Sequence, residues 1–199
     1  QVVSTSNDLV LRINGTTARS LDELLDHSRL LWLTPAMDGL FAGPASERRK
    51  FLDRLVLAIN PGHGRRVADF ERAMRGRNRL LGETDPDSAW LDAIETQLAE
   101  TGIAIVMARA ELVQVLSAVI VREALPESRF PDAVIGMEGP LEALASEMAA
   151  SDLEALYLDR LRAGRGLDAA AGRTLEGPHR SEFKVIHRLK AMPAELCST

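Results

Sequence analysis

The chain has a single cysteine, Cys197, among its 199 residues, and it opens without a secretory signal. A lone cysteine cannot form an internal disulfide, and no group of Cys and His has the spacing of a zinc site, so a reducing compartment is expected. Gln1 to Val3 show no charged segment followed by an apolar core. No apolar stretch approaches the roughly 20 residues of a membrane-spanning helix. These absences predict a soluble, cytoplasmic protein with no membrane contact.

Sequence motifs for nucleotide hydrolysis and covalent catalysis are also missing. A phosphate-binding loop needs Gly-x-x-x-x-Gly-Lys, and a magnesium site needs a carboxylate after a strand. Neither pattern occurs, and Gly164-Arg165-Gly166 has the wrong spacing. No Gly-x-Ser-x-Gly is present for a serine nucleophile, and no two histidines lie at i, i+3 or i+4. We therefore predict no catalytic residue and no metal site, and the chain alone is not expected to hydrolyse ATP.

Charge is unevenly distributed along a chain whose formal net charge is −5. The segment 44–82 contains ten basic and four acidic residues, a net charge of +6, so the remainder carries −11. A positive field on two neighbouring helices would attract the phosphates of DNA or of a nucleotide. The alternative is a solvated helix face that pairs with acidic neighbours elsewhere in the fold.

The order of the predicted elements indicates a sheet interrupted by helices, an α+β fold that is mostly helical. Asn14-Gly15 accepts the positive φ values of a tight hairpin turn after the apolar segment 9–13. Apolar residues that recur every three or four positions predict helices, and short apolar runs bounded by Pro or Gly predict strands. Helices are expected at 20–25, 45–59, 66–81, 88–124, 141–148 and 152–163, and further strands at 29–33, 133–137, 175–176 and 183–187.

The helix expected at 88–124 is the longest of these elements. Leu91, Leu98 and Ile105 belong to a series of apolar residues three and four positions apart, close to a heptad seam, that continues to Val119. At a rise of 1.5 Å per residue the helix would be on the order of 50 Å long, more than a compact domain of this size usually contains. We therefore expect it to project as an arm.

Several polar residues of the basic segment allow two interpretations. Arg48 and Arg49 diverge by about 100° around a helix, so one is expected to pair with Asp53 while the other points toward phosphate. Internal salt bridges to the sheet are the alternative, and Arg77 poses the same choice. Asn78 has a modest propensity for a helix interior, so we expect it to hydrogen-bond to the backbone of the helical region itself.

Three segments together resemble the bacterial RecF family of recombinational repair ATPases, namely 43–53, 75–81 and 174–180. Gly177-Pro178-His179-Arg180 is the most specific match among them. The resemblance spans almost the whole chain but only the central part of a RecF-like protein, without the segments that carry the phosphate loop and the magnesium carboxylate. Two departures concern detail: Ser181-Glu182 stands in place of an acidic pair, and Phe70 in place of a Tyr.

The resemblance implies an ABC-type nucleotide-binding head, related to that of SMC proteins, with a helical lid inserted between its strands. It places 1–37 and 173–199 in the head and 38–172 in the lid or arm. The phosphate loop of the family lies upstream of Gln1. Ser198 resembles the start of the motif that completes the nucleotide site of a partner subunit, although a frayed chain end is the plainer interpretation of Ser198 here.

As a member of such a family, the protein would be a weak ATPase that dimerises with ATP and Mg²⁺ and binds duplex or gapped DNA. It would act with RecO and RecR to load recombinase, in DNA repair, replication, recombination and the SOS response. Residues expected at the nucleotide or in coupling to the head are Thr34, Asp38, His179, Arg180 and Ser198. Thr34 and Asp38 are alternatively helix caps. Residues expected to contact DNA are Arg48, Arg49, Lys50, Arg65, Arg66 and Arg77.

A different class of function remains open from the residues alone. The chain would then be a stand-alone helical protein-interaction module without ATPase activity, whose long helix pairs with a partner helix. Changing Arg48, Arg49 and Arg77 to Glu separates the two hypotheses. The first predicts weaker, salt-sensitive binding of DNA or nucleotide, and the second predicts no change in either.

Overall fold

The fold begins with a small antiparallel sheet in the computed structural model, which describes residues 2–5, 8–18, 23, 34–123 and 132–197. This sheet consists of β1 (Val2–Thr5), β2 (Asp8–Ile13) and β3 (Thr16–Thr17). Asn14 and Gly15 have φ angles of 50° and 85°, so the predicted hairpin turn is confirmed. The strand expected at 29–33 and most of the helix expected at 20–25 lie outside the described residues.

Three long helices follow a short 3₁₀ turn, η1 (Pro35–Met37). They are α2 (Ala45–Ile59), α3 (His63–Leu81) and α4 (Ser88–Glu123). The bounds of α2 are those predicted, and α4 begins as predicted because Asp87 Oδ1 accepts the N–H groups of Ala89 and Trp90 at 2.9 and 3.1 Å. The helix α3 begins three residues earlier than expected, since the buried His63 bonds to Asp53 on α2.

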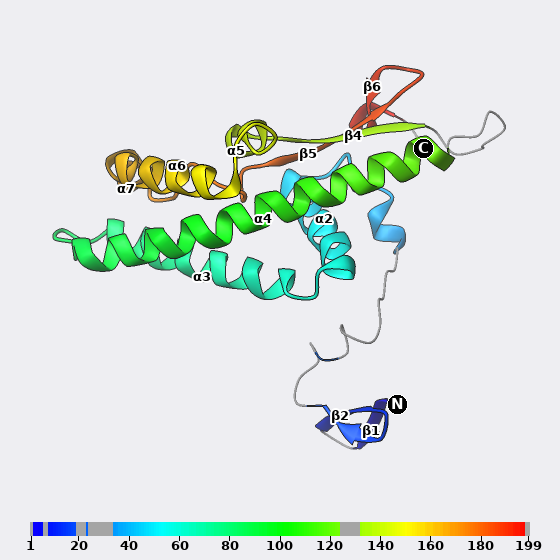
Figure 1. Ribbon diagram of the computed structural model, residues 1–199, viewed down its shortest axis with the longest axis horizontal. Coiled ribbons are helices and arrows are strands. Elements are labelled where there is room, and N and C mark those ends of the chain that lie inside the picture. Colours follow the sequence, from blue (N-terminus) through cyan, green and yellow to red (C-terminus); the bar gives the residue numbers. More distant parts are fainter. Residues whose placement is uncertain (1, 6–7, 19–22, 24–33, 124–131, 198–199) are drawn as a thin grey trace.

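The C-terminal part combines a second antiparallel sheet with short helices (Figure 1). Its elements are β4 (Ala133–Glu138), α5 (Pro140–Leu144), α6 (Ala150–Ala163), α7 (Arg165–Ala171), β5 (Glu182–His187), β6 (Met192–Pro193) and η2 (Ala194–Leu196). The sheet has the order β4-β5-β6, with Ile135 opposite Val185. The prediction missed α7 and placed the end of α5 four residues too late.

The predicted strand at 175–176 is wrong, because side chains rather than a neighbouring strand occupy its backbone. Asp168 Oδ1 accepts the N–H of Leu175 at 3.0 Å. The hydroxyl of Tyr157 donates to the carbonyl of Glu176 at 3.1 Å. The segment is therefore a fixed loop that leads into the Gly177 turn.

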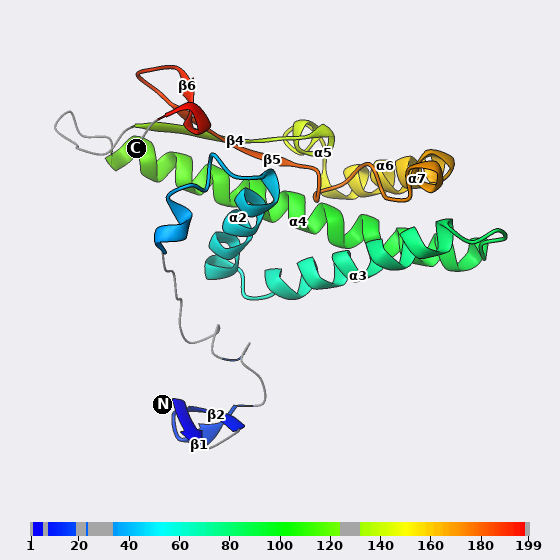
Figure 2. The same cartoon turned by 180° about the vertical axis from the view of Figure 1, so that it is seen from behind.

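The helix α4 is the central element, and other elements pack along most of its length. Figure 1 and Figure 2 show α3 on one side of α4, with α6 and the β4–β5 strands on the other. Leu91, Leu98, Ile105 and Leu112 are all buried, which confirms the predicted seam. The expectation of a projecting arm is wrong for this stretch, because buried residues occur from Leu91 to Leu112. Only the first turn and the last turns of α4 lack them, with Trp90 58% and Val115 50% exposed.

By length and composition alone, α4 would be able to cross a membrane, since its most apolar window has a mean hydropathy of 1.9. This corrects the expectation that no apolar stretch approaches that length. Within the fold, however, α4 contributes Leu98 and Val106 to a core with α3 and α6. Its Glu95 and Arg109 are buried in ion pairs. These contacts are those of a core helix.

Candidate functional site

The turn at Gly177-Pro178-His179-Arg180 is held on both sides by the helices. The N–H of Arg180 donates to the carbonyl of Gly177 at 2.9 Å and closes the turn. Arg109 Nη1, from α4, donates to the carbonyl of Pro178 at 2.7 Å. Gly177 has a φ of 140°, and a Cβ there would collide with the Tyr157 hydroxyl, so the turn requires glycine.

Behind the turn, a buried ion-pair chain joins three helices. Arg109 on α4 grips Asp53 on α2 with two hydrogen bonds, Nε to Oδ1 at 2.9 Å and Nη2 to Oδ2 at 2.8 Å. His63 Nε2 on α3 lies 2.8 Å from Asp53 Oδ1. Burial opposes the ionisation of Asp53, but the hydrogen bonds from His63 and Arg109 outweigh it and lower the pKa of Asp53.

A second buried network, centred on Arg77, holds the segment before the turn. Arg77 on α3 is fully buried and donates to Glu95 at 2.8 Å, to Asp168 at 2.6 Å and to the carbonyl of Leu161 at 2.7 Å. All three acceptors lie on other helices. The two carboxylates neutralise the buried guanidinium, so no charge in this network is left unpaired. The network connects α3 with α4, α6 and α7.

Asn78, next to Arg77, ties this network to the turn. Its Oδ1 accepts both the backbone N–H and the hydroxyl of Thr174 at 2.8 Å. Asn78 thus bonds to backbone, but the predicted partner is wrong, because Thr174 lies in the returning segment 173–199 rather than in the helical region itself. Thr174 in turn offers its carbonyl to His179 Nε2 at 3.0 Å.

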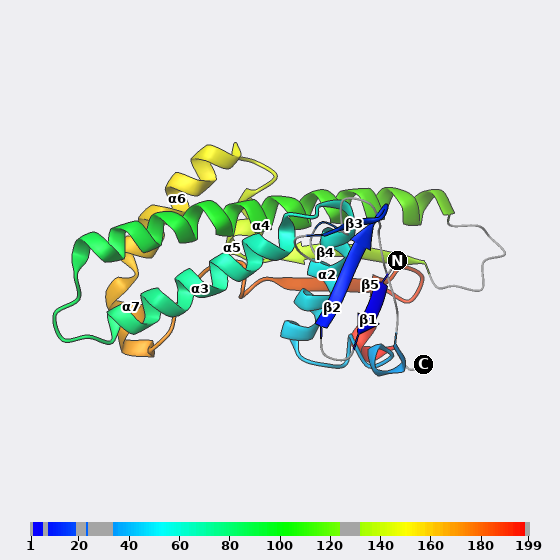
Figure 3. The same ribbon diagram turned by 90° about the horizontal axis from the view of Figure 1, so that it is seen from below.

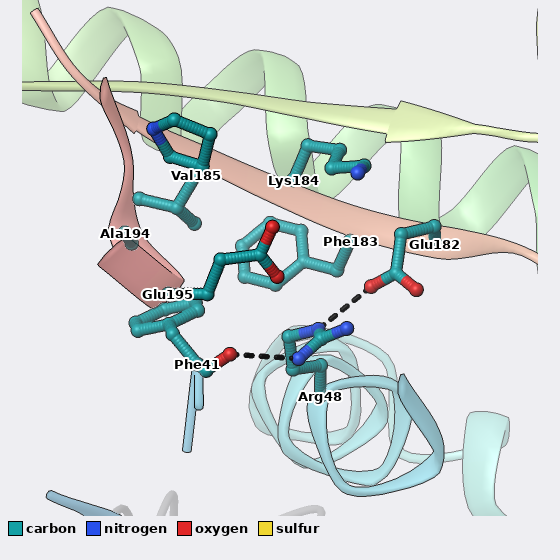
Figure 4. Close-up of a pocket in the computed structure, with 9 residues that line it drawn as sticks. Phe41, Arg48, Glu182, Phe183, Lys184, Val185, Ala194 and Glu195 are labelled. Atoms are coloured by element: carbon teal, nitrogen blue, oxygen red, sulfur yellow. Dashed lines mark hydrogen bonds and ion pairs between the residues drawn. The ribbon is translucent and has the colours of Figure 1, made fainter. Parts of the chain in front are cut away.

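Two of the expected DNA ligands, Arg48 and Arg77, serve the fold instead. Arg48 Nε donates to Glu182 on β5 at 2.6 Å, and its Nη1 donates to the carbonyl of Phe41 at 2.9 Å (Figure 4). The same Nη1 also donates to the carbonyl of Gly43 at 2.6 Å. The hydrogen bond to Glu182 raises the pKa of Arg48. Both arginines therefore make internal salt bridges, and neither pairs with Asp53. We remove both from the DNA contacts because their donors are occupied inside the protein.

The small hollow drawn in Figure 4 lies between α2, β5 and η2. Phe41 and Phe183 form its apolar wall, with ring centroids 6.4 Å apart. Its cavity volume is about 20 Å³, room for about one water molecule. The hollow is thus too small for a nucleotide.

A larger cleft, here called the turn cleft, opens beside the turn and has a volume of about 150 Å³. Its polar lining includes Arg49, Lys50, Asp53, Arg109 and His179, from α2, α4 and the turn. The structure thus brings together Arg49 and Lys50, expected at DNA, with His179, expected at the nucleotide side. Arg49 and Lys50 thus bring positive charge to the turn that the most specific motif forms.

The ionisable groups of the turn cleft are perturbed by burial. Arg49 Nη1 donates to the carbonyl of Ser181 at 2.8 Å. Burial, and then the nearby charge of Arg109, lower the pKa of Arg49. Burial also lowers the pKa of His179, whose ring centroid lies 5.9 Å from that of Phe70. The charges of Arg49 and Arg180 lie near a neutral His179 imidazole, so the cleft favours an anion over a cation.

The remaining predicted residues are distributed over the surface. Lys50 pairs with Glu47 at 2.8 Å, and the exposed Arg65 lies 3.8 Å from Asp69. Arg66 is half-buried, and Arg180 is exposed.

The expected head-coupling residues near the start of the described helices flank η1. Thr34 precedes it, and Asp38 follows it. Thr34 is exposed, and the coupling role of both residues stays a prediction. Ser198 lies outside the described residues.

The sequence interpretation did not single out Glu95 or Arg109 of α4. A signal was available, because Glu95, Gly102 and Arg109 recur every seven residues along the helix, as the apolar seam does. Two buried charges at that spacing indicate partners on one face of the helix. Within the part of the chain that the structure describes, no group of three or more His, Cys, Asp or Glu is placed to hold a metal ion.

Comparison with known proteins identifies this arrangement, although no family model matches the chain. A protein of Mesorhizobium japonicum named "DNA replication and repair protein RecF" is 60% identical over 190 residues, which cover 95% of this chain and 50% of the relative. The RecF of Allorhizobium ampelinum is 59% identical over 189 residues, with the same two shares. This chain belongs to the RecF family. It spans about half the length of the curated relatives that it matches.

Solved RecF structures share the fold of this RecF-family chain. A structure described as the recombination mediator protein RecF with ATP, in the RecFOR pathway, matches with a TM-score of 0.79 at 22% identity, over 96% of this chain and 51% of that one. A second, described as RecF-ATPrS, matches with a TM-score of 0.81. A mostly helical RecF fold with a small antiparallel sheet is therefore confirmed.

Proposed function

We propose that this chain is the lid and part of the head of an ABC-type ATPase that binds DNA in recombinational repair and replication-gap processing. The observation that carries the proposal is the identity of 60% to a RecF protein along 95% of the chain. The fold adds support, since α2, α3 and α4 follow one another after Gly43 and β5 returns to pair with β4. Boundaries near Asp38 and Arg173 are part of the proposal.

Nucleotide chemistry in this proposal belongs to the longer protein. The residues present do not fit ATP and Mg²⁺ by themselves, because no Gly-x-x-x-x-Gly-Lys occurs among them. Their proposed role is coupling. Arg109 links α4 to the carbonyl of Pro178, so a displacement of the turn at His179 and Arg180 would act directly on α4 and, through Asp53, on α2.

The proposed coupling extends to Thr34, Asp38 and Ser198 on the head side of the lid. In this scheme ATP drives dimerisation, and the dimer acts with RecO and RecR to load recombinase in the cytoplasm, including during the SOS response. The supporting observation is the similar fold of a solved protein that is described as RecF-ATP in the RecFOR pathway.

For DNA contact we retain the basic residues whose side chains reach solvent, namely Arg49, Lys50, Arg65 and Arg66. Lys50 and Arg65 make exposed ion pairs within one helix, which are weak and leave their charges available to phosphate. Neutralising phosphates releases counterions, so removing a basic side chain from the interface should change both the affinity and its salt dependence.

The test replaces Lys50, Arg65 and Arg66 together by Glu and measures duplex DNA binding over a series of salt concentrations. We expect weaker binding and a salt slope reduced by about 0.9 for each phosphate that the variant no longer neutralises. The matched control is Arg122→Glu, an exposed arginine near the end of α4. Unchanged affinity and slope in the triple variant would overturn the DNA interface and favour the helical interaction module.

A further inference from the structure

A second groove, separate from the turn cleft, lies between α3 and the first turns of α4 and has a volume of about 540 Å³. We call it the hairpin groove, because α3 and α4 run side by side there (Figure 3). Its lining shares no residue with the turn cleft and consists of Arg72, Ala73, Arg75, Gly76 and Arg79 from α3 and Trp90, Ile94 and Gln97 from α4.

The shape of the groove follows from the sequence of α3. Residues 72, 75, 76 and 79 lie three and four positions apart, so they share one helix face. Gly76 has no side chain, and a Cβ there would lie 3.4 Å from Cδ1 of Ile94. The absence of a side chain at Gly76 therefore deepens the groove. Trp90 also lines the groove, and 58% of this residue is exposed. A large exposed aromatic ring is informative in a chain with only 4% aromatic residues.

The charge of the groove is of one sign. Three of its lining residues are arginines, and none is acidic. Arg72 and Arg75 pair with Asp69 at 2.7 Å and Glu71 at 3.6 Å, exposed pairs within one helix that a polyanion can displace. Arg79 has no ion pair among the described residues. The neighbouring acid Asp92 is engaged by Arg165 at 2.5 Å.

We propose that the hairpin groove binds single-stranded nucleic acid, with a base stacked on Trp90 and the adjacent phosphates held by Arg75 and Arg79. A positive groove that follows the backbone, with an aromatic face for a base, is the arrangement by which single strands are bound without sequence preference. A duplex cannot use Trp90 in this way because its bases already stack on one another. The proposal goes beyond the duplex contacts at Lys50, Arg65 and Arg66 and does not depend on them.

An acidic peptide is the competing occupant, and the geometry favours it less. Such a peptide would satisfy the arginines, but an apolar anchor residue gains its binding energy from an enclosed, desolvated pocket. Trp90 lies on an open wall, with more than half of its surface in solvent. A flat ring in that position suits a planar base.

Intrinsic fluorescence gives a direct test, because the chain has two tryptophans, Trp32 and Trp90. In a Trp32→Phe variant the emission reports Trp90 alone. We expect an oligo(dT) single strand to quench it saturably and in a salt-dependent way, and a duplex of equal phosphate count to quench it much less. Quenching by a poly-glutamate peptide but not by oligo(dT) would overturn the proposal in favour of a peptide site.

Substitutions then assign the roles of individual residues. Trp90→Leu keeps an apolar side chain but removes the stacking face, so affinity for oligo(dT) should fall by about 5- to 100-fold, while Trp90→Phe should retain most of it. Arg79→Glu should weaken binding and reduce its salt slope, whereas the control Arg122→Glu should not. Wild-type affinity of Trp90→Leu, with an unchanged circular dichroism spectrum, would exclude the site.

The two DNA proposals fail separately under these measurements. The triple variant at Lys50, Arg65 and Arg66 should lose duplex binding and keep the quenching of Trp90 by oligo(dT). Trp90→Leu should keep duplex binding and lose affinity for a fluorescently labelled oligo(dT), followed by the anisotropy of the label because this variant has no Trp90 emission. Loss of both activities in Trp90→Leu would place the single-strand contact at the duplex surface and overturn the hairpin groove as a distinct site.

Discussion

Arg77 illustrates at the level of one residue how a cation that resembles a phosphate ligand in the sequence becomes a structural group. Its guanidinium is fully buried, and its partners Glu95 and Asp168 are also buried. Arginine suits this position because its planar group offers five donors in a fixed geometry, enough for two carboxylates and the carbonyl of Leu161. Glu95 receives a second cation from Arg165 at 2.5 Å, so the cluster is nearly balanced in charge.

Replacing Arg77 by Met should destabilise the protein by about 3–5 kcal/mol, because Glu95 and Asp168 would be left without their common partner inside the fold. Urea unfolding followed by circular dichroism measures the change. The matched control is Arg79→Met, a lining residue of the hairpin groove on the same helix, for which we expect a change within about 0.5 kcal/mol. Equal effects of the two substitutions would show that the Arg77 network contributes nothing specific.

His179 should make stability depend on pH in the range where few other groups titrate. Burial lowers its pKa, so the unfolded chain binds more protons than the folded one below the unfolded pKa of about 6.5. The contribution of His179 is therefore complete above that pH and is lost as the pH falls toward the folded pKa. The wild type should lose more free energy of unfolding than His179→Gln between about pH 7.5 and 5.5.

The measurement pairs two observations on the same samples. NMR titration of the His179 ring should give a pKa below that of an exposed histidine. Unfolding in urea at the two pH values then gives the difference between wild type and variant. A ring pKa at or above about 6.5, or identical pH dependence in the two proteins, would contradict the assignment of His179 as a half-buried, neutral imidazole.

At the level of the element, α4 carries two seams with different tasks. Leu91, Leu98, Ile105 and Leu112 form an apolar seam, and Glu95, Gly102 and Arg109 form a second one. The outer members of the second seam bind Arg77 and Asp53. The middle member, Gly102, lies where aromatic rings approach α4 from α3 and from α6. One helix thereby positions both ion-pair systems that hold the turn.

Gly102→Ala sets helix propensity against packing. Alanine favours a helix by about 1 kcal/mol over glycine. The new Cβ, however, would lie 2.9 Å from Cε1 of Tyr157 and 3.2 Å from Cε2 of Phe70, and overpacking of a core costs about 1–3 kcal/mol. We expect net destabilisation in thermal unfolding. Gly166→Ala, where a Cβ would have open space on α7, should instead be neutral or slightly stabilising. A more stable Gly102→Ala would show that Tyr157 moves away freely.

At the scale of the whole molecule, α4 joins two apolar cores. One contains Phe70, Leu98, Tyr157 and Leu161, and the other contains Leu52, Val56, Leu112 and Phe183. The Gly177 turn is tied by Arg109 and Tyr157 to residues beside these cores, so the turn is rigid with respect to both. A displacement of the turn would therefore also displace α4 and α6, to which it is hydrogen-bonded.

Hydrogen exchange should map this organisation onto a single helix. Amides of α4 between Leu91 and Leu112 should exchange slowest, because buried residues recur throughout that stretch. Amides beyond Val115 should exchange faster, since Val115 and Val121 are 50% and 62% exposed. Exchange resolved by NMR or mass spectrometry checks the gradient. Uniform slow exchange to Glu123 would indicate that another surface covers the end of α4.

Features that depend on neighbouring residues were predictable from the sequence. The bounds of α2, the seam of α4 and the turn at Asn14-Gly15 follow from apolar periodicity and from the φ values that Asn and Gly tolerate. The Gly177-Pro178-His179-Arg180 motif, being contiguous, indicated the family. Periodicity, turn preference and a contiguous motif each depend on residues that are close together both in the sequence and in the structure.

Pairings across long separations were decided by the tertiary structure alone. Arg48 meets Glu182 across 134 positions, and Arg77 meets Asp168 across 91. Nothing local distinguishes these arginines from Arg65 and Arg79 of the same segment. Local patterns therefore sufficed for the long helices, the turn chemistry and the family, but not for the short helix α7. Which cations remain in solvent to meet a phosphate was decided by burial, because a charge taken out of water requires an opposite charge beside it.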